Sequence, residues 1–171
     1  MSNGRREVFD LSRFLHQEHW AVILYGSLLT IAAALGSRKL NKVLLPIYIV
    51  FIMYMTLMYR EIGIGKLKLA LFWSYRRFLS STAYRMEILN NIWLFVPLGA
   101  IVYRLYPKWR ATLVPVVISV GVEAMQYLMS VGVCELDDVI SNGIGGVIGV
   151  MVCWLVRRLL GLVPGLGEER N

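Results

Sequence analysis

The sequence predicts an all-α membrane protein: a polytopic bundle of five transmembrane helices, with an interfacial amphipathic segment between the second and the third. Three observations predict this fold. Apolar residues form 57% of the 171-residue chain and charged residues only 17%, whereas soluble domains have about 45–50% and about 25%. Five apolar runs approach the roughly 20 residues that cross a bilayer. Charged and aromatic side chains bracket these runs, as anchors at membrane interfaces do.

The apolar runs, in chain order, cover residues 20–35, 43–59, 88–106, 111–131 and 139–163. We expect one membrane domain over 1–171, with a polar N-terminal tail at 1–19 and a flexible C-terminal tail at 164–171. The segment 61–87 mixes basic and aromatic residues, and it is too charged to span a membrane. We expect it to lie in the headgroup layer, although an ordinary solvated loop is the alternative.

The net charge of +7 indicates a protein of the cell membrane rather than a nucleic-acid partner, because the basic residues flank apolar runs and would face anionic headgroups. Under a five-span topology the lysines and arginines divide equally between the two sides. The two shortest connections, 38–42 and 108–110, are also the most basic. This favours a cytoplasmic location for their side of the membrane and an exterior location for the N-terminus. The basic N-terminal tail favours the opposite orientation.

The fourth run carries the strongest chemical signal. Ser119, Glu123, Gln126 and Ser130 recur at i, i+4, i+7 and i+11, which is one face of a helix. A charge in the middle of a membrane helix costs about 2.5–3.5 kcal/mol, so such residues face a protein interior or a wet cavity. Glu123 is therefore either a ligand-binding or proton-handling carboxylate, or a hydrogen-bonded group that holds helices together.

The fifth run begins with an acidic pair, and Asp138, Asn142, Gly145 and Gly149 then share one stripe. Asp137 or Asp138 is a candidate ligand group, or alternatively a cap at a helix N-terminus. The glycine spacing is a small-xxx-small packing motif, which also suggests a homo-oligomer formed through this face. The predicted helix-packing residues are Gly99, Gly145, Gly146 and Gly149.

Polar residues of the other elements fall on the same side of the membrane. Asn91 lies in the third run ahead of Pro97, which removes a backbone donor and tends to kink the helix. Arg60 closes the second run, where it binds a ligand or snorkels to the surface. We expect one headgroup-sized polar pocket, with a ligand-binding set of Arg60, Ser74, Tyr75, Asn91, Ser119, Glu123, Gln126, Asp137, Asp138 and Asn142.

Three motifs on successive runs resemble the VanZ-like family. They are the stretch 91–99, the Ser119-xxx-Glu123-xx-Gln126 spacing and the stretch 135–149, and the resemblance covers about 45–158. It implies a membrane protein linked to low-level resistance to the glycopeptide teicoplanin, without an established molecular activity. Many members carry a basic residue just before the acidic pair. In this chain Gly132, Val133 and Cys134 occupy those positions, so an ion-pair role would fall to Arg60 or Arg85.

These observations favour an envelope protein that binds a lipid or lipoglycopeptide headgroup. Its expected partners are membrane lipids or lipid-like amphiphiles, and no cofactor is expected. One alternative is an intramembrane hydrolase or transferase, with Glu123 as general base and Asp137 or Asp138 holding a divalent cation. Against it, the sequence has no recognisable Ser-His or Cys-His arrangement. The other alternative is a small transporter or flippase subunit.

Overall fold

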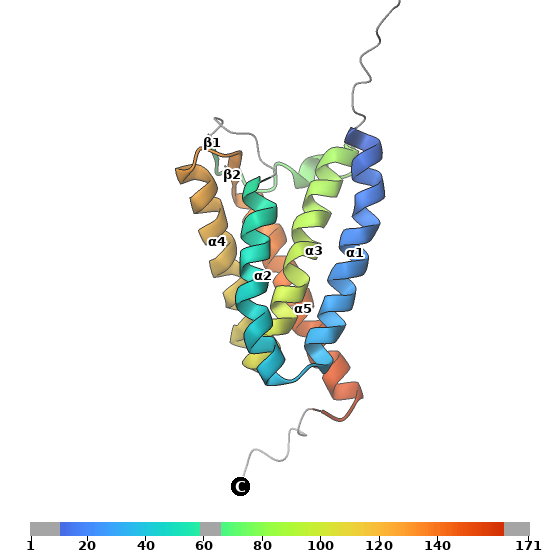
Figure 1. The fold of residues 1–171 in the computed structure, drawn as a ribbon. Coiled ribbons are helices and arrows are strands. Elements are labelled where there is room, and N and C mark those ends of the chain that lie inside the picture. The colour runs from blue at the N-terminus through green and yellow to red at the C-terminus, as the bar shows by residue number, and fades with distance from the viewer. Residues whose placement is uncertain (1–10, 59–65, 163–171) are drawn as a thin grey trace, which may run out of the picture.

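The computed structural model describes residues 11–58 and 66–162 of the chain. Five helices run alternately down and up in one bundle (Figure 1). The start of α1, the end of α2 and the start of α5 therefore lie at one end, as the five-span prediction requires. The helices are α1 (Leu11–Leu35), α2 (Arg38–Met58), α3 (Thr82–Leu105), α4 (Leu113–Leu128) and α5 (Leu136–Leu159).

The predicted all-α membrane bundle is confirmed. In the described residues, four stretches are long and apolar enough to cross a membrane: α2, α3, α5, and α4 together with the short 3-10 helix η2 (Trp109–Thr112) before it. The apolar part of α1, Ile23–Leu35, is shorter. Two helices extend beyond the predicted apolar runs: α1 begins at Leu11, inside the polar N-terminal tail, and α3 begins at Thr82, ahead of the run that starts at 88.

The predicted polar stripe of the fourth run ends one turn early. α4 stops at Leu128, and Ser130 follows it in the left-handed region with φ of 54°. Ser130 is exposed, whereas Ser119, Glu123 and Gln126 are buried. The first three positions of the stripe therefore face the protein, and the fourth does not.

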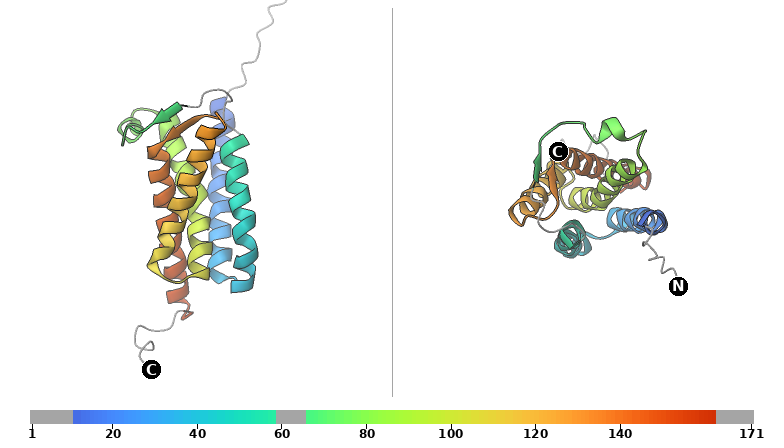
Figure 2. Two further views of the ribbon diagram at one scale, coloured as in Figure 1. Left: turned by 90° about the vertical axis from the view of Figure 1, so that its left-hand side faces the viewer. Right: turned by 90° about the horizontal axis from the view of Figure 1, so that it is seen from above.

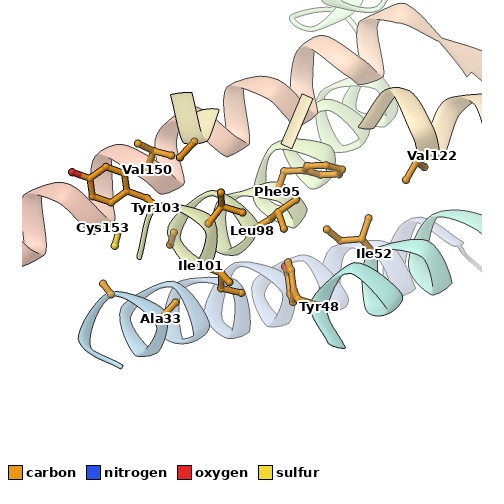
Figure 3. Close-up of a cluster of buried hydrophobic side chains, with 14 residues drawn as sticks. Ala33, Tyr48, Ile52, Phe95, Leu98, Ile101, Tyr103, Val122, Val150 and Cys153 are labelled. Atoms are coloured by element: carbon orange, nitrogen blue, oxygen red, sulfur yellow. The ribbon is translucent and has the colours of Figure 1, made fainter. Parts of the chain in front are cut away.

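The apolar core is built around α3, which contacts the other four helices. Phe95, Leu98 and Ile101 of α3 are fully buried, and Ile52 of α2 packs into the same cluster (Figure 3). The Tyr48 hydroxyl donates a hydrogen bond of 2.9 Å to the Leu94 carbonyl. This bond gives the one polar atom of a buried ring a partner inside the apolar region.

Close contact between α3 and α5 depends on glycine. A side chain at Gly145 or Gly149 would collide with the Ile92 or Val96 carbonyl of α3, and one at Gly99 would collide with Gly146. The backbones approach this closely because no Cβ intervenes. α3 of the same chain already covers this face, so the face has no space for the second copy that the spacing suggested.

The segment after residue 65 caps one end of the bundle (Figure 2). Its strand β1 (Lys66–Lys68) pairs in parallel with β2 (Val133–Glu135), and its 3-10 helix η1 spans Tyr75–Arg77. The sequence predicted neither strand. The cap exposes both apolar and basic side chains, including Leu69, Leu79 and Arg76. Its location in the headgroup layer stays a prediction.

Candidate functional site

Asp137 attaches the cap to α5. Its Oδ1 accepts a hydrogen bond of 2.6 Å from the Phe72 amide, and its Oδ2 accepts bonds from the Ser74 amide (2.9 Å) and the Ser74 hydroxyl (2.6 Å). Asp137 is 1% exposed. Phe72 has φ of 58°, a left-handed backbone conformation that is unfavourable for residues with a Cβ atom. The carboxylate thus holds a strained loop in place rather than capping its own helix.

Tyr75 extends this network along α5. Its hydroxyl lies 2.8 Å from the Ser141 hydroxyl, which donates to the Asp137 backbone carbonyl at 2.9 Å. Burial raises the pKa of Tyr75 and the carboxylates of Asp137 and Asp138 raise it further, while the hydrogen bond to Ser141 lowers it. Tyr75 therefore remains a neutral hydrogen-bonding group near neutral pH.

Glu135 links β2 to the cap, a role that the sequence did not predict. The indole Nε1 of Trp73 donates to Glu135 Oε2 at 2.9 Å, and Lys68 Nζ lies 3.6 Å from Oε1. The Lys68 ammonium also lies over the Trp73 ring. The available signals were an aromatic residue and a lysine in one segment and an acidic cluster in another. Only the pairing of β1 with β2 brings these two segments together.

Glu123 points toward β2 rather than toward lipid. Its Oε2 accepts a hydrogen bond of 2.9 Å from the Glu135 amide, and the side chain is 4% exposed. Burial raises the pKa of the Cys134 thiol, and the charge of Glu123 and a hydrogen bond to it raise the pKa further. Asp138 has a smaller effect in the same direction. The carboxylate predicted in mid-membrane thus lies near the acidic start of α5.

Two further hydrogen bonds connect α4 to its neighbours. The Asn142 amide donates to the Ser119 hydroxyl at 2.8 Å, which joins α5 to α4. The Gln126 amide donates to the Thr56 carbonyl at 3.1 Å, which joins α4 to the end of α2. Polar side chains that would be costly in lipid therefore form hydrogen bonds between helices.

Among the described residues, three buried side-chain polar atoms at this end of the bundle have no hydrogen-bond partner. They are Asn91 Nδ2 on α3, Gln126 Oε1 on α4 and Asn142 Oδ1 on α5. Gln126 is 1% exposed and Asn142 is 2% exposed. An unsatisfied buried polar atom costs about 1–3 kcal/mol, so such atoms indicate contact with water or a ligand. The set offers two acceptors and one donor.

The predicted site residues differ in how far the structure connects them. Hydrogen bonds join Ser74 to Asp137 and Ser119 to Asn142. Arg60 lies outside the described residues. Three protein donors already occupy most of the acceptor positions of the Asp137 carboxylate, which leaves little capacity for its proposed metal role. Within 11–58 and 66–162, no group of three or more His, Cys, Asp and Glu side chains is arranged to hold a metal ion.

Fold and site together define a helical membrane protein with a buried cluster of carboxylates and amides at one end of its bundle. Comparison with known proteins agrees: the chain belongs to the VanZ/LLP1 family, whose pattern matches residues 45–157. It is 26% identical to Protein VanZ of Enterococcus faecium over 132 residues, which cover 71% of this chain and 78% of that relative. No solved structure matches the chain significantly.

Proposed function

We propose that this chain is a multi-pass protein of the cell membrane that binds the polar headgroup of a lipid or lipoglycopeptide, and that this binding underlies tolerance to teicoplanin-type glycopeptides. One observation carries the proposal: unpartnered amide atoms of Asn91, Gln126 and Asn142 occur on three different helices of the same end. The family supports the link to glycopeptides, and the apolar helices support the location in a membrane.

The chemistry of the unpartnered atoms favours a ligand with amide or hydroxyl groups. Gln126 Oε1 and Asn142 Oδ1 each need a donor, and Asn91 Nδ2 needs an acceptor. A peptide or sugar headgroup supplies both kinds of group, whereas a bare phosphate supplies only acceptors.

Binding of teicoplanin to the purified full chain in lipid nanodiscs tests this proposal directly. We expect Gln126→Leu to weaken binding about two- to tenfold, as the loss of one hydrogen bond of about 0.5–1.5 kcal/mol implies. Tyr127→Leu is the matched control, because Tyr127 is adjacent, exposed and on another face of α4. It should bind as the unaltered chain does.

The cellular test uses the same variants together with Glu123→Ala. We expect both site variants to lower teicoplanin tolerance, while the Tyr127 control keeps it, at equal protein levels by immunoblot. Full tolerance in both site variants would refute the proposal. Release of a product from labelled membrane lipid by the purified protein, abolished by Glu123→Gln, would instead support the hydrolase or transferase alternative.

A further inference from the structure

The end of the bundle opposite the polar site is strongly basic. The described segments at this end are 36–42, 104–112 and 157–162, and none of them contains Asp or Glu. Their positive charges have no neighbouring carboxylate in these segments. The basic residues are Arg38, Lys39, Lys42, Arg104, Lys108, Arg110, Arg157 and Arg158.

Three arginines of this end, Arg38, Arg104 and Arg157, form what we call the arginine cluster. Arg104 Nε donates to the Gly36 carbonyl at 2.9 Å, and Arg157 Nη1 donates to the Ala34 carbonyl at 3.3 Å. Both side chains are therefore turned toward the last turn of α1. Arg38 follows two residues after Gly36, so all three arginines lie at the turn between α1 and α2. Backbone carbonyls carry only partial charges, so the cluster favours binding of an anion.

An apolar groove of about 420 Å³ lies between α1, α2 and α3, and it extends along α3 as far as Ile101. Its lining includes Leu29, Leu44, Tyr48 and Ile101, and Figure 3 shows Tyr48 and Ile101 among the core side chains of α2 and α3. Ile101 precedes Arg104 by one helical turn. Ile47 on the groove is 59% exposed, so the groove opens to the surroundings of α2, which are lipid in a membrane-spanning helix.

We propose that this junction binds an anionic phospholipid, with its phosphate on the arginine cluster and one acyl chain in the groove. The guanidinium groups select an anion, while the groove selects a hydrocarbon. The groove lining reaches Leu44 on α2, less than two helical turns after Arg38, and Ile101 on α3, one turn before Arg104, so a single amphiphile can span both features. Anionic lipids give the cytoplasmic leaflet its negative surface. The basic end then faces the cytoplasm, and the polar site faces the outside.

Native mass spectrometry of the purified full chain tests this proposal, with phosphatidylglycerol and phosphatidylcholine as probes. We expect retention of phosphatidylglycerol over phosphatidylcholine, and about fivefold weaker retention in Arg104→Gln, from the usual contribution of one basic residue near an anionic membrane. Lys66→Gln removes the same charge from an exposed site at the opposite end. This control should bind as the unaltered chain does.

A second variant tests the groove without altering charge. Ile47→Trp fills the groove and should also weaken phosphatidylglycerol retention, whereas Val50→Trp, on the exposed surface of α2 outside the groove lining, should not. Circular dichroism checks folding, and the Ile47 variant decides the matter if Arg104→Gln does not fold. Equal retention of the two lipids, or unaltered retention in the folded site variants, would overturn the proposal.

Discussion

Replacing Asp137 with asparagine measures how strongly this one carboxylate holds the cap. The substitution keeps the size of the side chain but leaves only one acceptor oxygen. If that oxygen replaces Oδ2 and keeps both bonds to Ser74, the new NH₂ group faces the Phe72 amide, and two donors then oppose each other. The Phe72 N–H loses its acceptor in a partly buried position.

The expected cost follows from these three bonds. An unsatisfied donor that is only partly buried costs about 1 kcal/mol, and each of the two remaining bonds loses about 1 kcal/mol when its acceptor is no longer charged. The sum is about 3 kcal/mol for local opening of the cap. Since about 1.4 kcal/mol corresponds to a factor of ten, amide exchange at Phe72 and Ser74 should accelerate on the order of a hundredfold or more.

Hydrogen–deuterium exchange with mass spectrometry, on peptides covering residues 66–81, measures this effect in lipid nanodiscs. Ser80→Ala is the control, because the exposed Ser80 hydroxyl donates only to the Arg77 carbonyl within the cap. It should leave the protection of Phe72 and Ser74 unchanged. Unchanged protection in both Asp137→Asn and Asp137→Ala would show that the carboxylate does not hold the cap.

Two further predictions concern helix packing and the thiol beside the site. Gly149→Val should destabilise the bundle by more than the roughly 1–3 kcal/mol of ordinary overpacking, because its side chain would meet the α3 backbone. Gly121→Ala, with no atom within 4 Å of the added carbon, should be neutral or stabilising; equal thermal stability of the two variants contradicts this reasoning. Since burial first and then Glu123 raise the pKa of Cys134, Glu123→Gln should lower that pKa and speed alkylation by iodoacetamide at pH 8. A slower reaction would show that Glu123 does not favour the protonated thiol.

The helical period correctly predicted which polar residues of α4 face the protein. Ser119, Glu123 and Gln126 share one face of α4 and are all buried, because side chains at i, i+4 and i+7 necessarily point in one direction on a helix. Ser130 fails for a local reason: the helix ends at Leu128, so the period no longer applies. The sequence carried no strong signal for that end, since no proline follows Leu128 closely and Gly132 lies beyond the turn.

The cap shows what a local pattern could not predict. β1 and β2 are three residues each, and their parallel pairing sets Lys66 opposite Val133. Strands this short show no clear alternation of polar and apolar residues. A local pattern also could not predict which of Asp137 and Asp138 anchors the cap. The donors to Asp137 come from a loop more than 60 residues earlier in the chain.

The amino-acid sequence by itself determined that this chain is a membrane helical bundle and which polar side chains of α4 face the protein. These properties depend on hydropathy and on the fixed rise and turn of a helix, both of which are local. Only the tertiary structure decided which acidic residue anchors the cap, which glycines contact α3, and which amide atoms lack partners. Each of these depends on contact between two segments that are far apart in the chain. The local sequence of one segment does not indicate which other segment it contacts.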